Sequence, residues 1–365
     1  MRHAIISIFL LVITFASNVF GWSGKEHILI TRCAIRELLA DPKTPEDMKQ
    51  WLRDGQPQLG TLEDEHQFLL HQKVGMKPLG VDGLAYWSVM PDLMVNAPGG
   101  RDNKVAPLGV TEQSLHFVDL EYLLPNVADR NFATDLSHKP ALAAIPRDIA
   151  DPRWQKAGML PFRIEDCYKK MVDQIRQNRL ADKVGQLPTD EHATNWAGML
   201  SHYAADNTMP MHATADYQAY SFFPEFKIKP KVHFDMEYKL TDDDNADHLD
   251  LREAFWKSFA ADLTTTTAPA FTTDVWTSSM ELSRSSYDAL PLIGAAARAA
   301  YLDKDGQLRP IDANVFYNFA GNVDGKPTTI LQMKAYQTAR AVKWVELLWL
   351  HAWQESHETM REQGN

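Results

Sequence analysis

Apolar residues recur at helical spacing along much of the chain, which predicts a mainly helical protein. Lys25–Leu39 and Arg163–Arg179 both repeat apolar residues at the spacing that gathers them on one face of an α-helix. Thr189 is a suitable N-cap for another helix, which we expect to run to about Asp206. Similar patterns predict helices over Leu249–Leu263, Ser283–Leu302 and, richest in strong helix formers, Thr328 to about Arg361.

Long polar connections that contain proline and glycine separate these segments. Alternating apolar and polar runs, which are typical of strands, are scarce and short. Because no stretch has the composition of a linker between two domains, we expect one multi-helical all-α domain over residues 22–365. Connections of this length usually carry function. They are Pro91–Gly109, Pro125–Pro161, Met209–Lys231 and Leu302–Lys326.

The first 21 residues have the pattern of a signal peptide. Arg2 gives a basic start, Ala4–Ala16 is almost wholly apolar, and Val19 and Gly21 occupy the −3 and −1 positions of a cleavage site. The apolar run is short for a membrane span, although an uncleaved anchor is the alternative. Cleavage would make Trp22 the first residue of a secreted or periplasmic protein. No later segment is long and apolar enough to span a membrane, so we expect the processed chain to be soluble.

Composition narrows the function classes. The chain has 365 residues and 45% hydrophobic content, enough for a sizeable core. Its net charge of −11 argues against a stable scaffold role on nucleic acid, but not against an enzyme that cuts it. Cys33 and Cys167 lack the CxxC spacing of a thiolate metal site, which leaves histidines and carboxylates as candidate ligands. Whether the two cysteines form a disulfide is left open.

The segment His202–His212 carries the most informative pattern of candidate ligands. His202 and Asp206 are four residues apart, so on a helix they share one face. Pro210 cannot continue the helix, and the resulting turn would return His212 to the helix end. Two imidazoles and a carboxylate in this arrangement suit zinc. The alternative is an ordinary amphipathic helix with a polar pair on its surface.

Other candidate ligands are weaker when taken singly. His233 and Glu237 repeat the spacing of four residues, and Asp235 would point to another side of the same helix. His116 lies between apolar residues, where a buried structural histidine is the alternative, and Asp119 follows it closely. The remaining candidates are His27, near the expected new N-terminus, and Asp92, in the expected loop after Pro91.

Taken in order, these residues resemble the zinc-dependent phospholipases C and the S1/P1-type nucleases, which share one helical fold. The expected last helix also looks like the last helix of that family. The gap between His116 and His202 is longer than is usual there, which indicates an insertion within Pro125–Pro161. The matching elements are Trp22, His27, Asp92, His116-Phe-x-Asp119, His202-x3-Asp206-x5-His212 and His233-x3-Glu237.

The resemblance implies three zinc ions and a metal-activated water that attacks a phosphate ester. Asp92 would orient or deprotonate this water, or serve as a ligand alone. Asp119 and Asp235 would be carboxylates supporting the ligands or plain surface acids. Because the amine of Trp22 would be a ligand, cleavage before Trp22 would be a condition of activity. The implied ligands are Asp92, His116, His202 and Asp206 for one ion; Asp206, His27 and the amine and carbonyl of Trp22 for the second; and His212, His233 and Glu237 for the third.

The substrate is less firmly indicated. Pro210-Met211-His212 and the closing Glu237 resemble the phospholipase branch, so we expect a phospholipase C that acts on phospholipid. The early position of His27 and the His116-Phe-x-Asp119 run look nuclease-like, which makes an S1/P1-type single-strand nuclease or 3′-nucleotidase the alternative. Lys25 stands where choline-lipid enzymes of the family have an acid, which argues against a preference for a cationic headgroup. A non-catalytic zinc-binding protein is a further alternative.

Aromatic residues between two of the ligand segments are candidate substrate contacts. Tyr220, Phe222 and Phe223 could form an apolar wall for a lipid glycerol or a platform on which a base stacks. Ordinary packing of loop aromatics on the core is the alternative. The sequence does not predict the oligomeric state.

Overall fold

A computed structural model describes residues 22–57, 59–71, 83–97, 100–124, 136–183, 190–241, 248–271 and 274–362. The expected signal peptide at residues 1–21, the expected N-cap Thr189 and residues 125–135 of the expected insertion lie outside these ranges. Helices dominate the described part, which confirms the mainly helical class. Its strands form two antiparallel hairpins, β1 (Lys104–Val105) with β2 (Val110–Thr111) and β3 (Ala320–Val323) with β4 (Lys326–Thr329).

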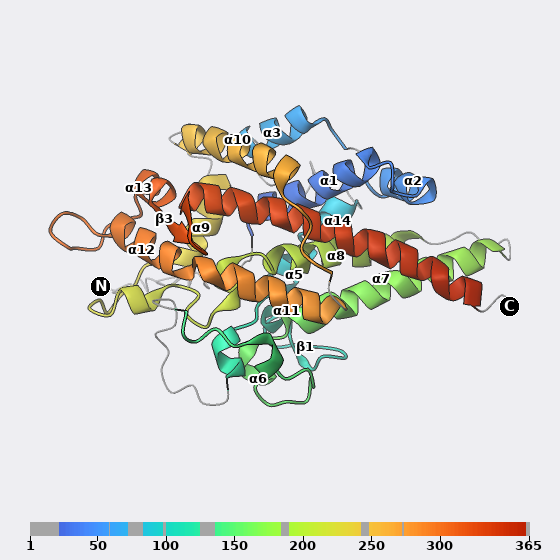
Figure 1. The fold of residues 1–365 in the computed structure, drawn as a ribbon, viewed down its shortest axis with the longest axis horizontal. Coiled ribbons are helices and arrows are strands. Elements are labelled where there is room, and N and C mark those ends of the chain that lie inside the picture. Colours follow the sequence, from blue (N-terminus) through green and yellow to red (C-terminus); the bar gives the residue numbers. More distant parts are fainter. Residues whose placement is uncertain are drawn as a thin grey trace, which may run out of the picture.

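A group of long helices forms the centre of the molecule. Helix α8 (Asp190–Asp206) packs against α1 (Gly24–Ala40), α7 (Leu160–Lys183) and α14 (Ile330–Glu362). Figure 1 shows α14 crossing much of the length of the molecule. The apolar faces of these helices are buried against one another, and α14 contributes the fully buried Trp344 and Trp349. These four helices therefore hold much of the core.

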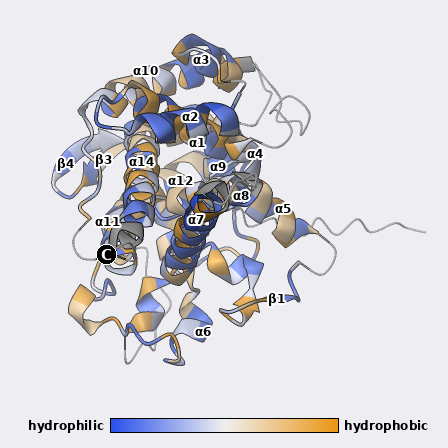
Figure 2. Ribbon diagram, turned by 90° about the vertical axis from the view of Figure 1, so that its right-hand side faces the viewer, coloured by the Kyte–Doolittle hydropathy of each residue, from blue (hydrophilic) through white to orange (hydrophobic). Residues whose placement is uncertain are grey.

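Further helices surround this centre. Helix α10 (Leu249–Thr265) packs on α14 and α3 (Leu62–His71), and α11 (Val275–Ser286) packs on α7. The ribbons alternate between hydrophilic and hydrophobic segments, as expected of helices with one buried face (Figure 2). The others are α2 (Glu46–Gly55), α4 (Leu84–Trp87), α5 (Met90–Asn96), α6 (Trp154–Ala157), α9 (Val232–Thr241), α12 (Leu290–Tyr301) and α13 (Ala313–Asn318).

Among the described helices, none is long and apolar enough to cross a membrane. Cys33 and Cys167 are both buried and neither forms a disulfide, which settles the alternative that the sequence left open. Burial raises the pKa of both thiols, that of Cys167 to about 11. Both cysteines therefore act as small apolar side chains of the core.

The structure corrects two expectations about elements. The helix expected over Ser283–Leu302 is broken, because α11 ends at Ser286, a 3₁₀ turn spans Tyr287–Ala289, and α12 begins at Leu290. Pro291 lies in the first turn of α12, where its missing N–H does no harm, whereas it would interrupt a continuous helix. The loop expected over Pro91–Gly109 begins inside α5, so Asp92 stands on a short helix.

Candidate metal centre

Eight of the predicted ligand side chains form one buried cluster. All are histidines or carboxylates, and none is more than 4% exposed. Three groups among them place their ligand atoms within 4.8 Å of one another, so each group could hold a metal ion. The groups are His27, Asp92 and His202; His116, His202 and Asp206; and His212, His233 and Glu237.

The start of α1 fixes His27 and Trp22. A capping box opens the helix, in which the Ser23 hydroxyl accepts from the Glu26 N–H and the Ser23 N–H donates to the Glu26 carboxylate at 3.2 Å. Trp22 is fully buried, and its indole N–H donates to the carbonyl of Ala205 at 2.8 Å. Because Ala205 precedes Asp206, these contacts hold the beginning of α1 against the end of α8.

A buried ion pair ties α1 and α9 to α14. Lys334 Nζ lies 2.8 Å from Glu26 Oε1, and both side chains are fully buried. The same ammonium donates to the carbonyl of Met236 at 2.8 Å and lies 5.0 Å from the centre of the Trp22 ring. Met236 stands between His233 and Glu237 in the sequence. One lysine of the last helix therefore braces two segments that carry cluster residues.

Close approach of two helices positions His202. A Cβ atom on Gly198 of α8 would lie 2.7 Å from the carbonyl oxygen of Leu84, so the absence of a side chain lets α4 lie directly on α8. Just beyond α4, the carbonyl of Ser88 accepts from His202 Nδ1 at 2.7 Å. That bond directs the other ring nitrogen, Nε2, toward the cluster. Asp92 Oδ1 lies 3.8 Å from it.

Asp206 is the centre of the first two groups. One of its oxygens lies 3.0 Å from His116 Nδ1 and 3.2 Å from His202 Nε2. The other lies 3.5 Å from His27 Nε2. A single carboxylate thus faces imidazoles from three separate segments. This is an arrangement in which a carboxylate can bridge two cations.

The third group is built where α8 ends and α9 begins. After Asp206 a turn leads into the 3₁₀ helix η4 (Pro210–Ala213), which returns His212 to within 3.9 Å of the Asp206 carboxylate. His212 Nδ1 donates to the carbonyl of His116 at 2.5 Å, so its Nε2 keeps a lone pair. That atom lies 3.1 Å from His233 Nε2 and 3.7 Å from Glu237 Oε1. The turn expected at Pro210 and the shared face of His233 and Glu237 both occur.

The donor atoms fit zinc. Ligands bound to one tetrahedral zinc at 2.0–2.2 Å are about 3.3–3.6 Å apart, close to the separations measured here. Several cluster atoms are buried and make no hydrogen bond to any described residue, which is costly unless another partner satisfies them. Among these atoms are His27 Nε2, Asp92 Oδ1, His116 Nε2 and Asp206 Oδ1.

The electrostatics of the cluster favour a bound cation. Burial lowers the pKa of His27 and His233 well below the usual value, so these imidazoles are neutral and able to donate to a metal. Burial also raises the pKa of Asp92, to about 7. The nearby His202 lowers this pKa, whereas the Asp206 carboxylate raises it. Burial raises the pKa of the Glu237 carboxyl well above its usual value. A divalent cation would offset the cost of ionising these carboxylates.

Not every residue singled out in the sequence belongs to the cluster. The Tyr301 hydroxyl donates to the Asp235 carboxylate, so Asp235 faces α12. Asp119 is half-buried, and burial together with the Glu121 carboxylate raises its pKa well above the usual value. Neither residue belongs to the three groups of candidate ligands.

The expected aromatic wall is corrected in part. Phe223 is fully buried and packs edge-on against Tyr301, so it is a core residue without access to a substrate. Phe222 packs on α12, where a Cβ atom on Gly294 would lie 2.0 Å from its ring. Of the three, Tyr220 is the most accessible, at 40% exposure.

Two backbone carbonyls and the ring of Phe117 were missed in the sequence as supporting groups. The carbonyls of Ser88 and His116 orient two of the imidazoles, and no residue type marks a carbonyl for this role. The rings of Phe117 and Tyr217 lie 6.0 Å and 5.8 Å from those of His212 and His233. Phe117 is half-buried and Tyr217 is 39% exposed. The position of Phe117 directly after His116 was a signal that could have been used.

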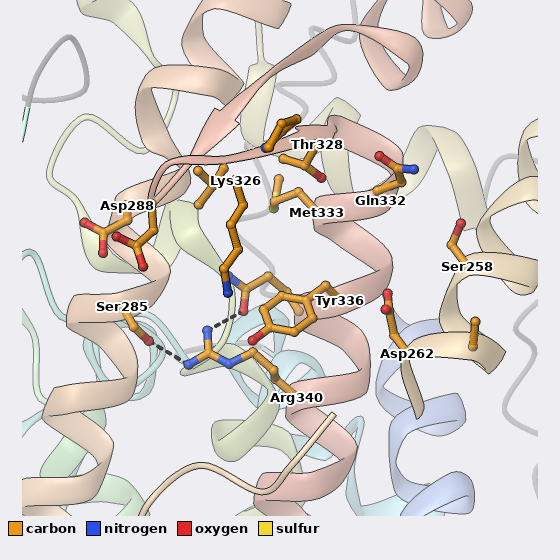
Figure 3. Close-up of a pocket in the computed structure, with 15 residues that line it drawn as sticks. Ser258, Asp262, Ser285, Asp288, Lys326, Thr328, Gln332, Met333, Tyr336 and Arg340 are labelled. Carbon is orange, nitrogen blue, oxygen red and sulfur yellow. Dashed lines mark hydrogen bonds between the residues drawn. The ribbon is translucent and has the colours of Figure 1, made fainter. Parts of the chain in front are cut away.

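A separate pocket of about 570 Å³ lies between α10, the end of α11, the β3–β4 hairpin and α14 (Figure 3). Arg340 projects into it and bonds to the Ser285 hydroxyl at 2.7 Å, and Lys326 points toward the same region. Asp262, Asp288 and other polar residues complete the wall. No residue of the metal cluster lines this pocket, so it is a distinct feature of the molecule.

No model of a known protein family matches the chain. No curated protein matches it either. The chemistry of this chain must therefore be argued from the cluster itself.

Proposed function

We propose that the chain is a zinc-dependent hydrolase of phosphate esters. The observation that carries this proposal is the Asp206 carboxylate, which faces three imidazoles and lies beside a further group of three donors. Adjacent cation sites that share a carboxylate suit phosphodiester hydrolysis, because the reaction needs both an activated water and neutralisation of charge on the phosphoryl group. The ordered resemblance to zinc phospholipases C and S1/P1 nucleases supports the same reaction.

The residues of the chain would share the work as follows. His116, His202 and Asp206 would hold one ion, with Asp92 completing the set, and His27 would hold a second against Asp206. His212, His233 and Glu237 would hold the third. When bound, the ions would lower the pKa of a water molecule and stabilise negative charge on phosphate oxygens.

The chain itself would orient the reacting groups and limit the access of water. The carbonyls of Ser88 and His116 fix which nitrogens of His202 and His212 face the cluster. Asp92 is the carboxylate best placed to orient a water molecule or accept its proton. Burial raises the pKa of Asp92 to about 7, which supports the proposed role of this carboxyl.

Phospholipid is the first proposed substrate class, on the strength of Pro210-Met211-His212 and the closing Glu237. Single-stranded nucleic acid is the second candidate. The specific observation in its favour is the pair of accessible rings, Phe117 and Tyr217, beside the imidazoles of His212 and His233, on which a base could stack.

The first test compares two histidines of the same helix. His202→Gln should remove metal and reduce phosphodiesterase activity by at least about 10²-fold, because it deletes a donor shared by two groups. His192→Gln, which changes an exposed histidine of α8, should leave both unchanged. Elemental analysis of the purified proteins and hydrolysis of bis(p-nitrophenyl) phosphate measure the two effects. Full metal content and activity in His202→Gln would refute the proposal.

Product analysis separates the substrate classes. Release of phosphorylated headgroup from phospholipid supports the phospholipase, and 5′-nucleotides from single-stranded DNA support the nuclease. The same assays can examine processing, since a chain that retains Gly21 before Trp22 should lose the proposed N-terminal ligand and most of its activity. Full activity of that protein would remove Trp22 from the ligand set.

A further inference from the structure

The loop over residues 214–231 begins and ends at the third group of cluster residues. It follows η4, which carries His212, and it leads into α9, which carries His233. The Asp216 carboxylate accepts from the Tyr220 N–H at 2.7 Å, and the Gln218 side chain accepts from the His233 N–H at 3.1 Å. The first bond braces the loop internally, and the second ties it to the start of α9.

The last residues of this loop, just before α9, expose an unusual amount of apolar surface. Ile228 is 85% exposed, more than any other large apolar side chain in the part of the chain that the structure describes. Tyr217 and Tyr220 of the same loop are about two-fifths exposed. Single exposed apolar residues are ordinary on protein surfaces, but a nearly bare isoleucine gains free energy if an apolar phase covers it.

Positive charge surrounds Ile228. Lys227, Lys229 and Lys231 alternate with Ile228 and Pro230, in a chain whose net charge is −11. The acid nearest in sequence, Glu225, is paired with Arg298 at 2.6 Å and is therefore compensated. Lys227 and Lys231 are both exposed. The tip segment, residues 227–231, is a basic patch with an apolar centre on an acidic protein.

We propose that the tip segment docks this protein on the surface of a bilayer that contains anionic phospholipid. Ile228 enters the boundary between headgroups and acyl chains, and the exposed Lys227 and Lys231 contact lipid phosphates and anionic headgroups. This inference rests on the proposed hydrolase function and specifies its substrate as lipid in an interface. Docking here would hold the protein on the lipid surface through the loop that connects η4 and α9, the two elements that carry the third group of candidate ligands.

Lipid fits the tip segment better than nucleic acid does. Lysines near an anionic membrane and the burial of an isoleucine side chain both contribute favourable free energy to binding. A nucleic-acid backbone would reward the lysines but leave Ile228 in water, since an aliphatic side chain offers no face on which a base can stack. The combination of both features is typical of a peripheral membrane contact.

The test measures binding to vesicles and hydrolysis separately. Zinc-loaded protein is sedimented with vesicles of phosphatidylcholine alone or of phosphatidylcholine mixed with phosphatidylglycerol. Wild type should bind the anionic vesicles more tightly, and added salt should weaken that binding. Ile228→Ser and Lys227→Gln with Lys231→Gln should each weaken it by about tenfold or more, which corresponds to the loss of about 1.4 kcal/mol.

Matched controls change residues of the same kind elsewhere. Leu180→Ser removes another exposed apolar side chain, on α7, and Lys304→Gln removes another exposed lysine. Both should bind vesicles as wild type does. All variants should hydrolyse the soluble ester bis(p-nitrophenyl) phosphate at the wild-type rate, because the tip segment contributes no candidate ligand.

The outcomes are distinguishable. A protein that fails to hydrolyse the soluble ester contradicts the proposed function, whatever its vesicle binding. Tip variants that bind anionic vesicles as tightly as the controls overturn the docking surface while leaving hydrolysis intact. Tip variants that retain vesicle binding but lose affinity for single-stranded DNA overturn it in favour of a nucleic-acid contact.

Discussion

Among single residues, Glu346 shows how burial outside the cluster governs a charge. Burial raises the pKa of this α14 carboxyl to about 8. The Lys343 ammonium lowers this pKa, and the Glu37 carboxylate raises it. Lys343 lies 2.8 Å from Glu37 and 3.3 Å from Glu346, so one ammonium serves two acids. In the unfolded chain the carboxyl would titrate near its ordinary value of 4.5.

The sign of the resulting pH effect follows from linkage. Because the folded pKa is raised, the contribution of Glu346 to stability is complete below about pH 4.5 and is lost as the pH rises through about 8. Glu346→Gln should therefore change stability little near pH 4.5 and stabilise the protein by about 1–3 kcal/mol at pH 9. Urea unfolding at the two pH values measures this difference. Equal effects at both pH values, or the same profile in the control Glu281→Gln, would contradict it.

Single residues also show which parts of the site could be read from the sequence. His202 and Asp206 were found because a histidine and an acid four residues apart on a helix form a recognisable pattern of candidate zinc ligands. Phe223 was misplaced because an aromatic residue in a loop has the same sequence signature whether it faces solvent or the core. The carbonyl of Ser88 could not be found at all, since every residue has a carbonyl and only the fold selects one.

At the scale of elements, the contact between α4 and α8 is a sensitive point. Gly198→Ala would place a Cβ atom 2.4 Å from the Cβ of Trp87 and 2.7 Å from the carbonyl oxygen of Leu84, and neither atom is at the end of a flexible side chain. We expect the helices to separate, with a loss of about 1–3 kcal/mol in stability. Separation also moves the carbonyl of Ser88 away from His202, so zinc affinity should fall.

Chemical unfolding and zinc competition with a chromophoric chelator measure the two effects of Gly198→Ala. Gly55→Ala is the control, because the atom nearest to its new Cβ is the end of the Leu84 side chain at 3.3 Å, which can move. Unchanged stability and affinity in Gly198→Ala would show that the α4–α8 contact does not position the site.

Long helices with strong periodicity were predicted closely, and short ones were not. The expected helix over Lys25–Leu39 corresponds to α1, Gly24–Ala40, because many turns repeat the same apolar face. Helix α5 is seven residues long and contains Pro91, so its sequence carries too few turns to show a period. Ser283–Leu302 was predicted as one helix because the apolar spacing continues across the break between α11 and α12. Pro291 lies in the first turn of α12, just after this break.

For the whole molecule, removal of metal should lower stability cooperatively. Zinc-loaded protein treated with a chelator should lose roughly 3–4 kcal/mol for each tightly held ion and unfold roughly 5–15 °C lower, because ions bind only the folded state. Buried carboxylates without a cation add to the loss. Differential scanning calorimetry before and after chelation measures the shift, and added zinc should reverse it. An unchanged unfolding temperature after verified metal removal would argue against a metal centre.

The spacing of residues along the sequence could not predict that the cluster residues meet in space. His27 and Glu237 are separated by most of the described chain, and no local pattern states that they meet. The resemblance to a zinc-hydrolase family anticipated this meeting, and the fold brings the side chains together through the packing of α1, α8 and α9. Periodicity predicted the helices, but the way in which they pack depends on long-range contacts such as those of Trp22 and Lys334.

The pairing of Lys334 with Glu26 has a consequence for biosynthesis. Translation delivers residue 26 long before residue 334, so a nascent chain can contain every donor of the cluster while Glu26 of α1 still lacks its buried counter-charge. Until α14 emerges, the segments that carry His27 and His233 have no common brace. We therefore expect stable capture of the ions to follow the synthesis of α14.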